Sequence, residues 1–123
     1  MILVDTSVWV DHLHRREASL AAALEKDEAL VHPFVIEELA VGALAQRGVV
    51  LELLRHLRRP PVLDHDETLA LIETHHLWGR GLSAVDVHLI GSALLAVSSS
   101  LWTRDKRLID AARESGATVF VES

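Results

Sequence analysis

The strongest constraint on the fold of this chain is a repeated alternation of short apolar runs with longer helical segments. The first run, Ile2-Leu3-Val4, is closed by Asp5, and a later run, Leu101-Trp102, is followed closely by Asp105. Apolar runs this short are typical of buried strands in a parallel sheet. Strands are expected at residues 2–4, 29–31, 62–63, 101–102 and 118–121, and helices at residues 6–14, 18–26, 33–47, 49–58, 66–78, 83–98 and 105–115. This order predicts an α/β domain with a mainly parallel sheet.

Length and composition bound the class of protein. The 123 residues, half of them apolar, fit one domain that spans residues 1–123. No apolar run approaches the ~20 residues that cross a bilayer, and the first residues lack the basic region and cleavage site of a signal peptide. The sequence contains no Cys, which excludes disulfides and thiolate metal sites. A cytoplasmic protein is therefore expected.

Four acidic residues are expected to meet at one edge of the sheet. Asp5 and Asp105 lie at or just past the carboxyl ends of predicted strands, where sites lie in open α/β sheets. Asp86 lies near the start of a predicted helix, and Glu38 lies one turn before Gly42 on another helix. A glycine at that spacing leaves space beside the carboxylate. The four acids together predict a site, although each is weak evidence alone.

Each of these acids also has a purely structural explanation. Asp5 and Asp105 are well placed to cap the helices that follow them. Ser83-x-x-Asp86 matches the capping-box pattern, in which Glu or Gln is the usual third residue. Glu38, or its neighbour Glu37, can be a solvated residue on a helix. Both explanations remain open from the sequence.

The candidate site contains only oxygen ligands, which favours particular metals. Carboxylates brought together raise one another's pKa unless a cation is present. Mg²⁺ and Mn²⁺ prefer oxygen ligands and retain several waters. The eight His residues include adjacent or near-adjacent ones, such as His12 and His14 or His75 and His76, which diverge on a helix. A zinc site is therefore disfavoured, and Mg²⁺, or Mn²⁺ in its place, is expected.

At four segments the sequence resembles the PIN-domain family and, within it, the VapC toxins. Met1 to Trp9 is similar to the opening strand and Asp-Thr/Ser turn of the family, and His32 to Gly42 to its helix with Glu-Leu-x-x-Gly. Leu82 to Leu89 resembles the third acidic segment, and Leu101 to Leu108 resembles the Thr-x-Asp segment. The resemblance covers nearly the whole chain and implies a three-layer α/β/α fold with a mainly parallel central sheet.

The resemblance implies which residues form the site. Asp5, Glu38, Asp86 and Asp105 match the four acidic positions of the family, as metal ligands and catalytic residues. Glu37 is the ambiguous neighbour, and the Glu-Leu-x-x-Gly register selects Glu38. Two hydroxyls, those of Thr6 and Thr103, are implied to help position the metal or its water.

The implied function is an Mg²⁺- or Mn²⁺-dependent endoribonuclease that acts as the toxin of a type II toxin–antitoxin pair. The formal net charge of −6 disfavours an ordinary nucleic-acid-binding surface, but the four acids account for most of it. Arg80, Arg104 and Arg107 are then candidates to meet the RNA backbone.

Two kinds of protein partner are also expected. The resemblance implies a VapB-type antitoxin that lays a tail into an apolar groove near the site, and residues 18–26 and 49–57 are the apolar helices that suggest one. It also implies a homodimer, with the segment from Trp78 to Val87 at or near its interface. The apolar residues expected on that surface are Leu77, Trp78, Leu82 and Val87.

Two other functions remain as alternatives. A phosphate-accepting aspartate protein, either a phosphatase or a response-regulator receiver, would use Asp5 at the end of a strand. One such phosphatase class requires Asp-x-Asp, whereas position 7 is Ser, and the acids of a receiver are not clear. The second alternative is a PIN-like binding module without catalysis, against which all four acids are present.

Overall fold

A three-stranded parallel sheet forms the centre of the protein in the computed structural model, which describes residues 1–122. Its strands are β1 (Ile2–Val4), β2 (Ala29–Leu30) and β3 (Ser100–Trp102), in the order β2-β1-β3. The apolar side chains of β1 and β3 are buried, as their sequences predict. The parallel sheet is confirmed, and β1 lies at its centre.

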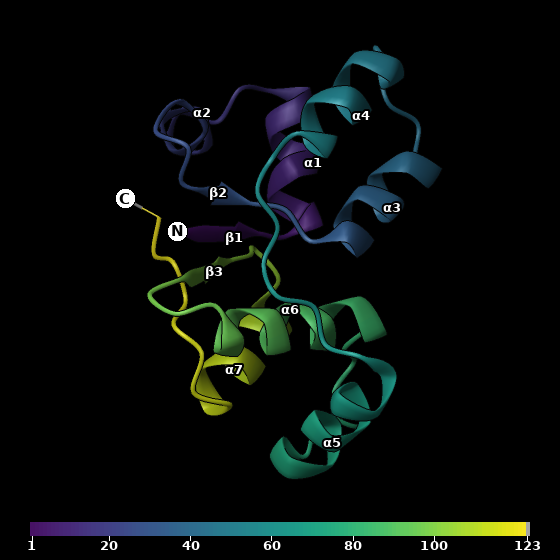
Figure 1. Cartoon of the computed structure of the whole chain (residues 1–123), viewed down its shortest axis with the longest axis vertical. Coiled ribbons are helices and arrows are strands. Elements are labelled where there is room, and N and C mark those ends of the chain that lie inside the picture. The colour runs from purple at the N-terminus through teal and green to yellow at the C-terminus, as the bar shows by residue number, and fades with distance from the viewer. Residues whose placement is uncertain (123) are drawn as a thin grey trace.

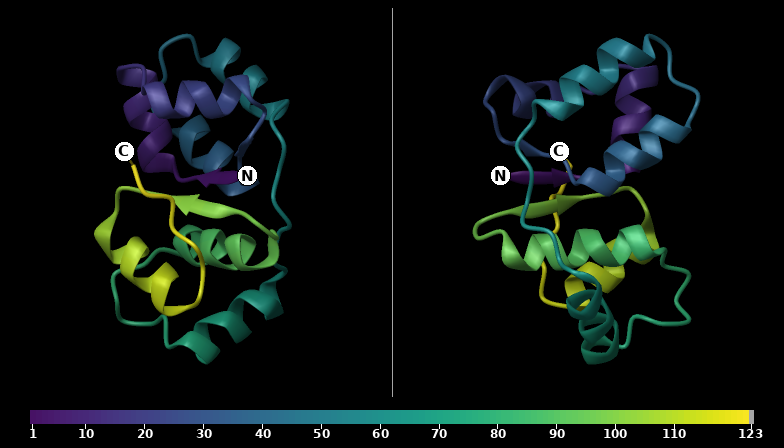
Figure 2. Two further views of the ribbon diagram at one scale, coloured as in Figure 1. Left: turned by 90° about the vertical axis from the view of Figure 1, so that its left-hand side faces the viewer. Right: turned by 45° about the vertical axis from the view of Figure 1, so that its right-hand side comes forward.

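Helices cover both faces of this sheet. On one side lie α1 (Thr6–His14), α2 (Ala18–Glu25), α3 (Pro33–Val41) and α4 (Arg47–Arg55), and on the other lie α5 (His65–His75), α6 (Ala84–Leu95) and α7 (Lys106–Glu114). Figure 1 and the turned views of Figure 2 show the two helical layers with the sheet between them. The predicted three-layer α/β/α architecture is therefore confirmed.

The register of the sheet brings Asp5 beside Thr103. Val4 pairs with Trp102 in the parallel ladder, and the backbone N–H of Asp5 donates to the carbonyl of Trp102 at 2.9 Å. The next residue on each chain, Asp5 and Thr103, therefore leaves the same edge of the sheet. This register makes the carboxyl edge of the β1–β3 pair the natural place for a site.

Two of the five predicted strands are absent as strands. Residues 62–63 are irregular, and the parallel bridge beyond β2 is made instead by Arg58 with Leu30. Pro60 and Pro61 lack a backbone N–H, so neither can donate to a neighbouring strand and the ladder is interrupted before residues 62–63. Within residues 118–121 a single bridge joins Val119 to Leu101, which extends the sheet without forming a full strand.

The boundary between the third and fourth helices also differs from the prediction. Helix α3 begins with Pro33 as expected, but it ends at Val41 with Gly42 as its cap. Gly48, expected to end that helix, lies inside α4, which begins after Gln46 at a positive φ of 50°. Tertiary packing of α4 outweighs the low helix propensity of a glycine in its first turn.

The segment expected at a dimer interface is more buried than predicted. Leu77 and Val87 belong to the core with exposed fractions of 4% and 3%, and Leu82 is half-buried. Trp78 is 56% exposed. The expected apolar surface therefore reduces mainly to Trp78. No helix within residues 1–122 is long and apolar enough to cross a membrane.

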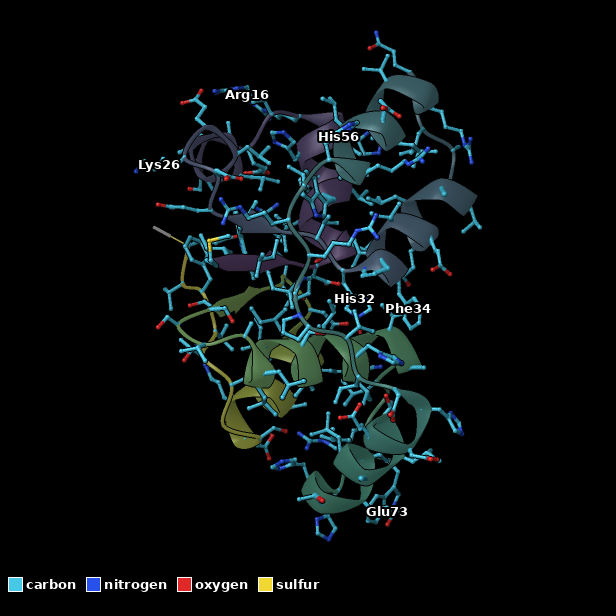
Figure 3. All side chains as sticks on the ribbon, viewed as in Figure 1. Arg16, Lys26, His32, Phe34, His56 and Glu73 are labelled. Carbon is cyan, nitrogen blue, oxygen red and sulfur yellow. The ribbon has the colours of Figure 1, made fainter. Side chains whose placement is uncertain are left out.

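A buried imidazole lies where α3 meets α6 (Figure 3). His32 is fully buried, and its Nδ1 accepts a hydrogen bond from the backbone N–H of Phe34 at 2.9 Å, which caps α3. Its Nε2 has no partner among the described residues, and the ring of His88 on α6 lies 5.7 Å away between centroids. Burial, followed by the charge of a protonated His88, lowers the pKa of His32 to about 4.

This buried imidazole predicts a loss of stability in mild acid. Between pH 6.5 and 4 the unfolded chain protonates His32 and the folded chain does not, so the free energy of unfolding falls as the pH falls, by up to about 3 kcal/mol. An Asn at position 32 can still cap α3 but cannot titrate. Urea unfolding of the wild type and His32→Asn across this pH range measures the difference.

His56→Asn is the matched control, because His56 lies on the surface. Its unfolding free energy is expected to follow the wild type at every pH. Parallel curves for the wild type and His32→Asn would show that His32 is not the group responsible.

Candidate active site

Asp5 is the most constrained acid of the candidate site. It is 7% exposed and follows β1 as the N-cap of α1. Its Oδ1 accepts from the backbone N–H of Thr6 at 2.8 Å, and its Oδ2 accepts from the hydroxyls of Ser7 at 2.8 Å and Thr103 at 2.7 Å. Three donors hold this carboxylate in a single orientation, which suits an ionised group.

The hydroxyl of Thr103 links two of the acids. It donates to Asp5 and accepts from the backbone N–H of Asp105 at 3.1 Å. Asp105 is the N-cap of α7, and its Oδ1 accepts from the backbone N–H of Arg107 at 2.9 Å. Asp105 is exposed, whereas Thr103 is buried. Thr103 therefore fixes the loop that carries Asp105 relative to Asp5.

Asp86 reaches the same edge from the first turn of α6. It forms a capping box with Ser83: its Oδ2 accepts from the Ser83 N–H at 2.9 Å, and its own N–H donates to the Ser83 hydroxyl at 3.1 Å. Burial is the largest cause that raises the pKa of Asp86, and the negative charges of Asp5 and Asp105 raise it further. The hydrogen bonds from Ser83 oppose that rise. Asp86 is therefore within electrostatic reach of both Asp5 and Asp105.

Glu38 joins the group through Thr6. The Thr6 hydroxyl donates to Glu38 Oε1 at 2.6 Å, which ties α3 to the start of α1. Glu37 is exposed and makes no side-chain hydrogen bond within residues 1–122. The structure therefore ties Glu38, and not Glu37, to the residue that follows Asp5.

Three of the acids also cap helices, as the structural explanation expects, and this role is compatible with a functional one. Asp5 and Asp105 cap helices, and Asp86 completes a capping box. Within the described part of the chain, however, Asp86 and Asp105 each use one carboxylate oxygen in these bonds. Their second oxygens remain available to a ligand or to water.

The acids do not form a closed metal cage. Among residues 1–122 no three His, Asp or Glu side chains are arranged so that together they could hold a metal ion. The donors are nevertheless all oxygens, and the charges of Asp5 and Asp105 both act on Asp86. Mg²⁺ usually takes one or two carboxylates and keeps its other ligands as water. The group therefore fits an ion held in this open manner and not one enclosed by four carboxylates.

One residue beside Asp5 has a role that the sequence did not predict. Ser7 was not singled out, yet its hydroxyl binds Asp5 and accepts from the backbone N–H of Arg104 at 3.3 Å. Its position two residues after Asp5, in an Asp-Thr-Ser turn, is the signal that could have identified it.

Arg104, one of the candidates to meet the RNA backbone, is already held by carboxylates. Its guanidinium contacts Asp11 at 2.6 Å, Glu17 at 3.1 Å and Glu122 at 2.7 Å. These three carboxylates raise the pKa of Arg104 further above its ordinary value. Arg104 thus ties α1, the start of α2 and the C-terminal segment together.

An apolar groove opens beside the acids. A pocket of about 520 Å³ between α1, α3 and α4 has Thr6 and Glu38 on its wall. A second pocket of about 280 Å³, between α1, α2 and α4, shares Leu13 and Val50 with the first. The two pockets therefore form a continuous apolar surface that leads to the acidic edge.

Comparison with known proteins agrees with this geometry. Residues 2–114 match the PIN domain family. Two relatives, both named Ribonuclease VapC32, come from the Mycobacterium tuberculosis strains CDC 1551 / Oshkosh and ATCC 25618 / H37Rv. Each is 55% identical over 122 residues, which cover 99% of this chain and 98% of the relative. The chain therefore belongs to the PIN-domain family and, within it, to the VapC group.

Proposed function

We propose that this chain is a divalent-metal-dependent endoribonuclease, the toxin of a type II toxin–antitoxin pair, and that it hydrolyses RNA phosphodiester bonds at the acidic edge. The observation that carries the proposal is the carboxylate of Asp5, held by three donors and within electrostatic reach of Asp86 and Asp105. The ribonuclease name of two relatives at 55% identity supports the same activity.

The residues proposed to hold the metal are Asp5 and Asp86, with Glu38 and Asp105 acting directly or through water. The chemistry that bound Mg²⁺ or Mn²⁺ supplies is neutralisation of phosphate charge and a lowered pKa of a water ligand. The all-oxygen donor set and the repulsion of Asp86 by Asp5 and Asp105 support this assignment.

The chain's own groups supply orientation and proton acceptance. Ser7 and Thr103 keep Asp5 in one orientation, and Thr6 holds Glu38 toward it. Asp105 is exposed and has an oxygen free of hydrogen bonds within the described residues, so it suits the role of accepting a proton from an attacking water. Preorganisation of this kind reduces the rearrangement needed in the transition state.

The alternative of a phosphate-accepting aspartate has less support than the ribonuclease. One such phosphatase class requires Asp-x-Asp, whereas position 7 is Ser. The two relatives at 55% identity carry a ribonuclease name. The presence of all four acids in the sequence counts against the alternative of a non-catalytic binding module.

The apolar groove is proposed as the docking site of the antitoxin tail. Its wall includes Leu24 on α2 and Leu53, Leu54 and Leu57 on and after α4, the two helical segments singled out in the sequence. Leu53 is 65% exposed. The groove continues to Glu38, so a tail that fills it would reach the acidic edge and block RNA.

Self-association into a homodimer is also proposed. Trp78 is 56% exposed and packs against the ring of His76, at a distance of 5.0 Å between centroids. An exposed tryptophan of this kind is a common anchor in interfaces. The proposal is narrower than the sequence suggested, because Leu77 and Val87 are buried.

RNA cleavage is predicted to require a divalent ion. Protein stripped with EDTA should leave a fluorogenic RNA intact, and Mg²⁺ or Mn²⁺ should restore cleavage, because the site contains only oxygen donors. A phosphate monoester serves as the control substrate and should remain intact throughout. Undiminished RNA cleavage without divalent ions would reject the metal assignment, and hydrolysis of the monoester would favour a phosphatase.

Glu38 and Glu37 are predicted to differ in their importance. Glu38→Gln should lower kcat/KM by at least about tenfold, since it removes a charge tied to Thr6 at the acidic edge. Glu37→Gln is the matched control, with the same chemical change one residue away on the solvated side, and should stay within about twofold of the wild type. Equal losses in the two variants would contradict the assignment of Glu38.

Antitoxin binding is predicted to depend on Leu53. Co-expression with the small protein encoded next to this chain should give a complex that is silent in the RNA assay. Leu53→Glu should weaken that complex at least about tenfold, because it places a charge in the apolar groove, and should leave cleavage unchanged. Leu69→Glu is the control, on an exposed leucine of α5, which lies on the other side of the sheet from α1, α2 and α4 (Figure 1).

Light scattering of the free chain and of the complex tests both partner proposals, because it gives the mass of each species. A free chain with the mass of a monomer would reject the homodimer. A Leu53→Glu complex as tight as the wild type would place the antitoxin elsewhere.

A further inference from the structure

The sequence offered three arginines as contacts for the RNA backbone, and two of them are already occupied. Arg104 is bound by three carboxylates. Arg80 pairs with Glu114 of α7 at 2.5 Å, and its side chain is 30% exposed. An arginine held by carboxylates must give up those partners before it can bind a phosphate, which costs part of what the new contact contributes.

Arg107 differs from Arg104 and Arg80 in its ionic partners. It is exposed, in the first turn of α7, two residues after Asp105. Among the ion pairs and hydrogen bonds of residues 1–122 its guanidinium has no carboxylate partner, whereas its neighbour Lys106 pairs with Asp110 at 3.2 Å. Arg107 therefore carries an uncommitted positive charge beside the site.

Gly81 holds that charge in place. A Cβ atom built on Gly81 would lie 2.4 Å from Nη1 and 3.2 Å from Cζ of Arg107, so the guanidinium packs directly on the glycine backbone. Gly81 also has a φ of +77°, a conformation that suits glycine. The absence of a side chain at this position makes room for the guanidinium.

The contact with Gly81 places Arg107 against the loop that precedes Asp86. Gly81 lies two residues before Ser83, whose N–H and hydroxyl bind Asp86. The backbone N–H of Arg107 itself donates to Asp105 at 2.9 Å. The guanidinium thus lies over the loop that leads to Asp86, on the helix that Asp105 caps.

From these contacts we infer that Arg107 binds a phosphate of the RNA backbone next to the scissile bond and so positions the strand on the acidic edge. This assignment rests on the proposed ribonuclease function. A guanidinium presents a planar fork that matches two phosphate oxygens. The surrounding carboxylates repel a nucleic acid, so a fixed cation at their rim offsets that repulsion where the strand must enter.

The test compares three variants in RNA cleavage and in RNA binding. Arg107→Gln should raise KM about tenfold with little change in kcat, because it removes binding that is equal in the ground and transition states. Arg107→Lys keeps the charge and loses the fork, and should recover part of the loss. Arg113→Gln removes the same charge from the last turn of α7 and should match the wild type.

Salt dependence separates phosphate contact from a structural role in the loop. Affinity for a labelled single-stranded RNA, measured by fluorescence anisotropy with Ca²⁺ in place of Mg²⁺, should fall less steeply with salt in Arg107→Gln, by about 0.7 in the logarithmic slope for one lost phosphate contact. An unchanged slope and KM, or a lower kcat and melting temperature with the wild-type slope, would overturn the inference.

The binding experiment also keeps the two proposals separate. If the wild type binds RNA and Arg107 sets the salt slope, but no cleavage occurs with Mg²⁺ or Mn²⁺, the ribonuclease proposal fails and the phosphate contact stands. If the wild type cleaves RNA and the Arg107→Gln slope is unchanged, the ribonuclease proposal stands and the phosphate contact of Arg107 fails.

Discussion

The hydrogen bond from the Thr103 hydroxyl to Asp5 joins the two central strands at the point where both leave the sheet. It spans 2.7 Å between buried groups and depends on the pairing of Val4 with Trp102 one residue earlier. A slip of one residue in that register would turn either side chain to the opposite face. Because Thr103 also receives the N–H of Asp105, the same register orients the start of α7. The position of the acidic edge is therefore a consequence of how β1 and β3 pair.

Three of the acids cap helices and can also take part in the chemistry of the site. Asp5 and Asp105 satisfy N–H groups at the starts of helices, and Asp86 completes a capping box. These bonds orient each carboxylate, so the site does not depend on flexible side chains. The cost is electrostatic, since burial and the neighbouring charges raise the pKa of Asp86. A bound cation relieves that repulsion, which is why the caps and the proposed metal site are compatible.

The arginines near the site are distinguished by their partners and not by their charge. Arg104 links α1, α2 and the C-terminal segment through three carboxylates, and Arg80 is paired with α7. Arg107 alone of these three rests on a glycine without a carboxylate among residues 1–122. In a chain with a net charge of −6, attraction for RNA depends on a few cations that are free and correctly placed.

Features that depend on a few neighbouring residues could be predicted from the sequence. Apolar runs identified β1 and β3, Asp5 and Asp105 identified the starts of α1 and α7, and the four acidic segments indicated a site and the family. Which side chains meet across elements became known from the fold. It brought Glu38 rather than Glu37 to Thr6, buried Leu77 and Val87, and engaged Arg104 with carboxylates far away along the chain. Local patterns report the conformation of the backbone, whereas these contacts depend on how helices pack over the sheet, which no short stretch of sequence encodes.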